Sequence, residues 1–267
     1  RDSPRKFTDI VMLKDFKKFV VNDVILGGNL IIKDGRYVHD FSLRFKYPTK
    51  AYRTINIKRL RSPAELLTKV NVHNGIAEVI TIRVTPGKTI TKKDKALVKV
   101  RDKYLSIRED QDITYVSVIE RHHASGSIGR GFVTGLGLRA GAVAQSIAHD
   151  THNIVVVGKN PVDMYVAVNG LSRIGGGIVG VVNGKVIGEV ALPIAGLMSD
   201  KKFEDLTQDI NKIAYALKML NLSYHAAFMT IALLTLPVIP EIRITARGLV
   251  DALEGKLIEP ILSLRKL

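Results

Sequence analysis

The segment AHDTHNIVVVGKNP, Ala148–Pro161, joins three kinds of local structure and decides the fold around it. Residues 149–153 have the composition of a polar turn, and residues 154–157 form a short apolar run that predicts a buried strand. Asn160 is a favourable N-cap, and Pro161 suits the first position of a helix. We therefore expect a buried strand that leads directly into a helix.

Strand and helix patterns continue on both sides of this segment. Residues 200–220 form the clearest helix, because their apolar side chains recur on one face with helical spacing. The glycine-rich residues 126–141 match no phosphate-loop pattern, so we expect a flexible or close-packed loop there. The fold class predicted is α+β, a mainly antiparallel sheet with packed helices. Strands are expected at residues 8–13, 20–26, 30–32, 52–57, 75–85, 95–100, 113–120, 142–148, 178–182 and 185–190, with a further helix at 160–174.

The sequence predicts two regions of unequal size. Residues 1–50 contain a small β-meander with a turn at residues 27–29, followed by a basic linker. A meander of this size is too small to be stable by itself, so it should pack on something else. Residues 51–267 hold the remaining strands and helices and form the larger α+β domain.

Positive charge is concentrated in the first part of the chain. Residues 1–110 hold 25 Lys and Arg against 12 Asp and Glu, whereas residues 111–267 hold 15 against 13. This asymmetry is compatible with a polyanion-binding surface, with a solvated basic face, or with docking on an acidic partner. No stacking-aromatic motif or nucleic-acid-binding module accompanies the charge, so nucleic acid is not the partner we expect.

Composition also indicates where the protein works. The chain contains no cysteine, so it has neither disulfides nor thiolate metal ligands. The longest apolar stretch, residues 226–239, is interrupted by Pro237 and is shorter than a membrane span. No segment has the pattern of a signal peptide. We expect a cytoplasmic protein that has no membrane partner.

Two polar segments hold the candidate functional residues. Four of the seven histidines lie in them, within otherwise apolar sequence. One segment follows the strand predicted at residues 113–120, and the other is the turn before the strand at residues 154–157. If these strands are neighbours in one sheet, the two segments meet at one edge. The candidates for a substrate contact or an active-site edge are His122, His123, Ser125, His149, Asp150, His152 and Asn153.

Three interpretations of these residues remain open. His149, Asp150 and His152 are weak candidates for metal ligands, because the H-x-x-H spacing alone is not specific. One histidine oriented by Asp150 is suited to acid–base chemistry or to substrate contact. The third interpretation is a polar turn whose side chains satisfy one another and the backbone. The residues alone assign no catalytic group and no metal ligand.

Several separate blocks resemble the C-terminal domain of adenine deaminases, in the expected order. The likeness extends over about residues 50–251, and the strand at residues 8–13 with its meander resembles the small β-domain that follows the barrel in amidohydrolases. The blocks are VIERHHASGSIGRGFVTGLGLRAGAVAQSIAHDTHNIVVVG (Val118–Gly158), LPIAGLMSD (Leu192–Asp200), FMTIALLTLPVIPEIRIT (Phe228–Thr245) and RGLVD (Arg247–Asp251).

The resemblance implies a metal-dependent hydrolase of adenine catabolism. In that family a divalent metal pair of the Mn or Fe type activates water, which replaces the amino group of adenine to give hypoxanthine and ammonia. The family's metal ligands lie in a (β/α)-barrel and include an H-x-H pair, and this sequence contains no H-x-H. The resemblance therefore implies that the barrel, covalent or separate, is a partner of this chain.

On this interpretation the chain shapes or closes the active site and is inactive alone. The alternatives are a non-catalytic ligand-binding or assembly module of the same fold, and a basic polyanion-binding domain. Exposed meander strands also make a homo-oligomer a candidate assembly.

Overall fold

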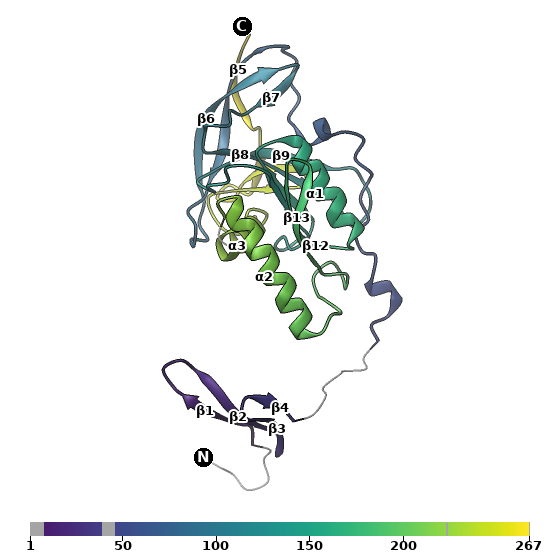
Figure 1. Cartoon of the computed structure of the whole chain (residues 1–267). Helices are drawn as coiled ribbons and strands as arrows, with labels where there is room; N and C mark the ends of the chain where they lie inside the picture. The colour runs from purple at the N-terminus through teal and green to yellow at the C-terminus, as the bar shows by residue number, and fades with distance from the viewer. Residues whose placement is uncertain (1–7, 39–45, 223, 267) are drawn as a thin grey trace. The chain divides into compact units, whose positions relative to one another are not determined.

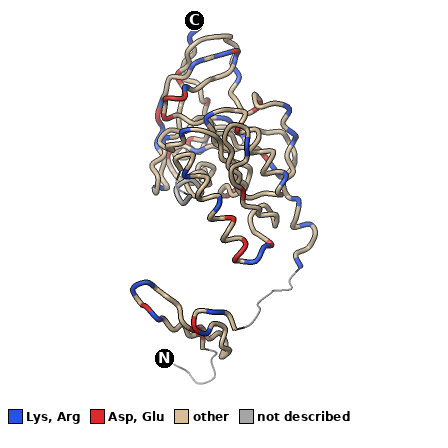
Figure 2. The backbone as a smooth tube through the Cα atoms, in the orientation of Figure 1, with Lys and Arg blue, Asp and Glu red and all other residues tan. Residues whose placement is uncertain are grey.

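The computed structural model describes residues 8–38, 46–222 and 224–266 (Figure 1). The chain divides into two units, residues 1–46 and 47–267. Residues 39–45 of the expected linker lie outside the described residues. Figure 2 shows Lys and Arg along the described backbone of both units.

The first unit contains one antiparallel sheet, and its strands confirm the predicted meander. The strands lie in chain order, each hydrogen-bonded to the next. Many of its large apolar side chains are exposed, Phe16 and Phe19 among them, so the unit buries little core of its own. The strands are β1 (Ile10–Asp15), β2 (Val20–Leu26), β3 (Asn29–Lys33) and β4 (Arg36–Tyr37).

A ten-stranded sheet is the centre of the second unit. Its order is β13-β12-β10-β11-β8-β9-β5-β6-β7, and β17 also pairs with β5. The strands are β5 (Gly75–Arg83), β6 (Lys92–Arg101), β7 (Tyr104–Ser106), β8 (Ile113–Ile119), β9 (Ile128–Thr134), β10 (Ala142–Gln145), β11 (Ile154–Gly158), β12 (Gly177–Val182), β13 (Lys185–Ala191) and β17 (Ile261–Lys266).

The remaining elements of this unit surround the sheet. They are the 3-10 turns η1 (Thr49–Ala51) and η2 (Pro63–Leu66), the helices α1 (Pro161–Arg173), α2 (Phe203–Met219) and α3 (Tyr224–Leu233), and a small sheet of β14 (Ile242–Thr245), β15 (Gly248–Asp251) and β16 (Lys256–Ile258). Among the described residues, no helix is both long enough and apolar enough to cross a bilayer.

The large sheet is mixed, which refines the antiparallel expectation. β5 and β9 run parallel, whereas the other strand pairings of the described part of the sheet are antiparallel. The parallel pair forms because β6, β7 and β8 intervene in the sequence and return the chain to the far edge of β5. Strand also predominates, at 40% against 17% helix, so the fold is mostly β.

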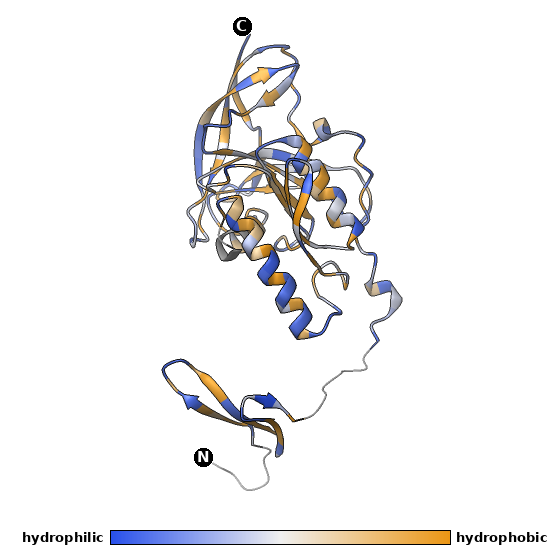
Figure 3. Cartoon of the chain, in the orientation of Figure 1, coloured by the Kyte–Doolittle hydropathy of each residue, from blue (hydrophilic) through white to orange (hydrophobic). Residues whose placement is uncertain are grey.

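Two apolar cores lie on the opposite faces of the sheet. Val116 and Val118 of β8 contribute to one core, whereas Tyr115 and Ile119 contribute to the other, as the alternation of side chains along a strand requires. The first core includes buried residues of α2, and the second includes buried residues of α1. Covering on both faces explains why every residue of β8, β10 and β11 is buried. Figure 3 shows hydrophilic and hydrophobic residues alternating along α2, as expected for a helix with one covered face.

Two predicted elements are wrong. The glycine-rich residues 126–141 contain the buried strand β9, because glycines allow the backbone of the β14–β15 hairpin to approach closely. A Cβ built on Gly129 would lie 1.8 Å from the Thr245 carbonyl oxygen. Residues 52–57 form no strand. Instead, the Asn56 backbone N–H donates to the Arg121 carbonyl oxygen, and the Asn56 carbonyl oxygen accepts from the Ala124 backbone N–H.

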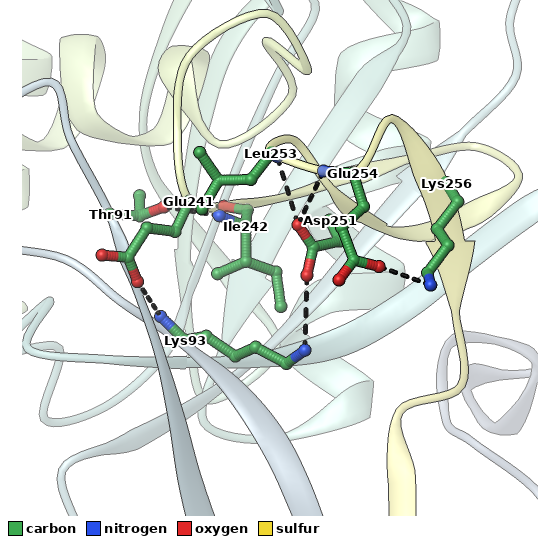
Figure 4. A network of polar contacts seen from close by, with 8 residues as sticks. All are labelled: Thr91, Lys93, Glu241, Ile242, Asp251, Leu253, Glu254 and Lys256. Carbon is green, nitrogen blue, oxygen red and sulfur yellow. Dashed lines mark hydrogen bonds and ion pairs between the residues drawn. The ribbon is translucent and has the colours of Figure 1, made fainter.

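A polar network joins β6 to the small C-terminal sheet (Figure 4). Thr91 donates its hydroxyl to the Ile242 carbonyl oxygen at 2.7 Å, and its backbone pairs with Pro240 and Glu241. The Glu241 carboxylate accepts the Lys93 backbone N–H, and the Lys93 ammonium lies 3.3 Å from the Asp251 carboxylate. The network fixes the small sheet against the large one.

The close approach at Gly129 generates a stability prediction. Gly129→Ala should lower the free energy of unfolding by about 3 kcal/mol, because the added methyl group must displace the backbone at Thr245. Urea unfolding followed by circular dichroism measures the change. Gly180→Ala is the matched control in another buried strand of the same sheet, β12, where the nearest atom to a built Cβ is in the Ile213 side chain at 3.4 Å. Equal costs for the two variants would contradict the packing argument.

Candidate functional site

The two polar segments meet at one edge of the large sheet. β8 and β11 pair in antiparallel register, with Ile119 opposite Ile154, so the end of β8 adjoins the start of β11. The Arg121 backbone N–H donates to Asn153 Oδ1 at 3.2 Å. His122 Nε2 lies 2.8 Å from the Thr151 carbonyl oxygen. The strand pairing on which the sequence argument depended is therefore present.

Glu120 organises the loop that follows β8. Its carboxylate accepts the backbone N–H groups of His122, His123 and Ser125, and also the Ser125 hydroxyl at 2.9 Å. Partial burial acts to raise the pKa of Glu120, but these hydrogen bonds outweigh it and lower the pKa to about 2. The carboxylate is therefore ionised at neutral pH and holds the loop in one conformation.

Arg121 is a buried cation beneath the same edge. Its side chain donates to the carbonyl oxygens of His152, Thr54 and Ala195 and to the Thr54 hydroxyl. Burial lowers its pKa. The guanidinium packs against the backbone of Gly196. A side chain at this position would clash with it, because a built Cβ would lie 2.8 Å from Arg121 Nη1. The guanidinium therefore ties two separate segments, around Thr54 and Ala195, to the polar turn.

His152 is the most enclosed histidine of the site. Its backbone is left-handed, with φ +47°, and its Nδ1 is buried without a hydrogen-bond partner among the described residues. Burial, followed by the charges of Arg121 and His149, lowers its pKa. The rings of His149 and His152 lie edge to face, with centroids 6.2 Å apart. Burial and the neighbouring positive charges therefore favour the neutral form of the His152 imidazole.

Four of the other candidates lie nearer to solvent, because His122, His123, Ser125 and Asp150 are exposed. His149 is half-buried, and Asn153 is buried. The Thr235 hydroxyl holds the His149 carbonyl oxygen at 2.7 Å. The structure brings the seven candidates to one edge.

The donor set of this edge does not fit a metal pair. Among the described residues, no group of three or more His, Asp or Glu side chains is placed to hold a metal ion. The carboxylate of Glu120 is already committed to backbone N–H groups and to a hydroxyl. His149, Asp150 and His152 therefore do not form a metal centre by themselves.

Sequence reasoning missed the two residues that organise the edge. Glu120 is the last residue of the strand predicted at residues 113–120, Arg121 separates it from the His122–His123 pair, and neither belongs to a recognisable motif. An acidic residue directly after a buried strand and before a short polar loop is a weak signal for such an N–H acceptor. The acceptors that surround Arg121 come from distant segments, so no local pattern could reveal them.

By its fold, the second unit is a β-rich domain with a polar sheet edge organised by a carboxylate and a buried guanidinium. Comparison with known proteins identifies the family: the Adenine deaminase C-terminal domain matches residues 88–256. The chain belongs to this family.

Sequence similarity to individual proteins extends well beyond residues 88–256. Adenine deaminase of Staphylothermus marinus is 43% identical over 256 residues, which are 96% of this chain and 42% of that protein. The adenine deaminase of Clostridium botulinum strain 657 is 39% identical over 93% of this chain and 41% of its own length. That of Moorella thermoacetica is 36% identical over 97% and 43%. The chain thus spans about two fifths of the length of these relatives.

The hydrogen bonds to Glu120 predict a pH-dependent contribution to stability. Because folding depresses the pKa of Glu120 to about 2, its contribution is complete above about pH 4.5 and is lost as the pH falls toward 2. Glu120→Gln should lower the free energy of unfolding at pH 7 by about 1–2 kcal/mol, and by less at pH 3. Chemical unfolding at the two pH values measures both differences.

Glu259→Gln is the control for this experiment. Glu259 is exposed and makes no hydrogen bond or ion pair within the described part of the chain. A pH-independent effect of Glu120→Gln, or an equal effect of Glu259→Gln, would contradict the role given to Glu120.

Proposed function

We propose that this chain is the C-terminal portion of an adenine deaminase and forms a wall or lid of its active site. The observation that carries the proposal is the similarity to adenine deaminases over nearly the whole chain but only about two fifths of their length. The whole protein would convert adenine and water into hypoxanthine and ammonia. Its divalent metal pair would be held by a barrel outside these residues.

The arrangement of the sheet edge supports a protein in which the barrel holds the metal ions and this chain forms a wall or lid. A wall or lid needs polar groups held in fixed positions, and Glu120 and Arg121 fix the backbone on both sides of the candidate residues. A neutral His152 can exchange hydrogen bonds with a purine without the cost of burying a charge. We assign these residues to substrate contact or closure.

The proposal also accounts for the first unit. We propose that residues 1–50 hold the remnant of the small β-domain that accompanies the barrel, joined by a linker to the domain at residues 51–267. The exposed apolar side chains of the meander favour contact with further protein, either the barrel or a second copy of the chain. The absence of cysteine favours a cytoplasmic protein.

The isolated chain should not deaminate adenine. The purified 267-residue chain with added Mn²⁺ or Fe²⁺ is expected to release no ammonia above the rate without protein, because its described residues offer no metal-holding group. An ammonia-release assay, with a complete adenine deaminase as the positive control, measures this. Turnover by the pure chain would contradict the proposal that the metal ligands lie elsewhere.

Substitutions at the edge should affect catalysis when a barrel is present. In a protein that joins this chain to its barrel, His149→Ala and His152→Ala should each lower kcat/KM about tenfold, because a misplaced wall disturbs substrate positioning. Metal content should be unchanged. Steady-state kinetics and metal analysis measure both quantities.

His73→Ala is the matched control, since His73 is an exposed histidine outside the polar edge whose Nε2 lies 3.7 Å from the exposed Asp102 carboxylate. Unchanged turnover in both edge variants would remove the assigned role and would favour a non-catalytic assembly module. Loss of metal from either variant would contradict the placement of the metal ligands.

A further inference from the structure

A groove outside the polar edge runs between η2, β9 and the C-terminal strands. Its largest part has a volume of about 620 Å³, within the range of small-molecule sites. A second part of about 440 Å³ shares Ser62, Glu65 and Ile128 with the first, so the two are continuous. None of the seven candidate residues of the polar edge lines either part. The groove is therefore a separate feature.

The lining of the groove is strongly basic. The charged residues on its walls are Lys58, Arg59, Arg61, Lys69, Arg130 and Arg247, against Glu65 and Glu259. The Glu65 carboxylate is occupied by the backbone N–H groups of Arg61 and Ser62 at the start of η2. Six cations therefore face two carboxylates, one of them already engaged. This balance favours an anionic ligand.

Arg130 is held with part of its guanidinium uncommitted. Its Nε donates to the Glu65 carbonyl oxygen at 2.8 Å, and its Nη1 donates to the Ile128 carbonyl oxygen at 2.9 Å. Within the described ranges, Nη2 has no hydrogen-bond or ion-pair partner. Two bonds thus orient a half-buried guanidinium in the groove wall and leave donors for an oxyanion.

The groove also has an apolar part that suits a flat ring. Tyr104 lines it together with Leu67, Leu249 and Leu257. An aromatic side chain among leucines provides a stacking surface for a planar heterocycle. A ligand with both a ring and an anionic group would use both parts of the lining.

We propose that this groove binds a nucleoside phosphate, with the phosphate on Arg130 and Arg247 and the base against Tyr104. The hollow shape and its volume favour a small molecule over a nucleic-acid strand, which needs an extended surface. This site is distinct from the edge that we assign to the deaminase active site. It therefore stands or falls independently of the proposed function.

Isothermal titration calorimetry on the 267-residue chain tests the proposal. The probes are AMP, ATP, adenosine and inorganic phosphate, each at low and at high salt. We expect AMP or ATP to bind with one-to-one stoichiometry, more tightly than adenosine or phosphate, and more weakly as salt increases. Arg247→Gln should weaken binding roughly tenfold, as the loss of one charged hydrogen bond does.

Arg139→Gln is the matched control, because Arg139 is exposed and lies outside the groove. It should leave affinity unchanged. Arg130→Gln should abolish binding, and a folded circular dichroism spectrum is required before that result counts. Arg247 is exposed, so its variant tests the site even if the Arg130 variant fails to fold.

Several results would overturn the proposal. They are absence of binding by AMP and ATP at millimolar concentration, equal affinity for adenosine and AMP, and an unchanged affinity in Arg247→Gln. Tight binding of a single-stranded oligonucleotide that neither nucleotide displaces would also overturn it and would indicate a polyanion surface.

Discussion

The antiparallel pairing of β8 and β11 is the constraint on which the second unit depends. Its register sets Ile119 opposite Ile154, which buries alternate side chains in two separate cores and brings two polar segments to one edge. A shift by one residue would exchange the faces of every side chain in the strand. Because both faces are covered, such a shift would have to repack both cores, and this fixes the position of the site as firmly as it fixes the fold.

Much of this arrangement could be predicted from the sequence. The polar turn, the strand at residues 154–157, the helix capped by Asn160 and the two strands at residues 178–182 and 185–190 follow from local patterns. The structure contains all of them. The buried strand β9 could not be predicted, because its glycines are explained by the approach of a hairpin more than 100 residues later in the chain. Arg121 was missed for the same reason, since its acceptors are brought together by the tertiary fold. The partners of Glu120 lie within five residues of it, but they form no motif that marks the carboxylate as their acceptor.

The site and the groove show two uses of buried or half-buried charge. Arg121 is buried and donates to four acceptors, so it serves to fix the surrounding backbone. Arg130 donates to two carbonyl oxygens and has further N–H groups with no partner among the described residues. The first arrangement is typical of a structural cation, and the second is typical of a ligand contact.

The position of β17 has a consequence for how the second unit forms. β17 pairs with the first half of β5, while β9 pairs with the end of β5. The hydrogen bonds along this edge of β5 are therefore completed only by a strand from the C-terminal end of the chain. Closing so large a loop is entropically costly, and contacts of high sequence separation slow the formation of a sheet. Until β17 arrives, an apolar strand keeps unpaired backbone groups that can recruit other chains. The domain therefore depends on rapid pairing of β17 with β5. If this pairing is slow, the unpaired edge of β5 is the place where association with other chains would begin.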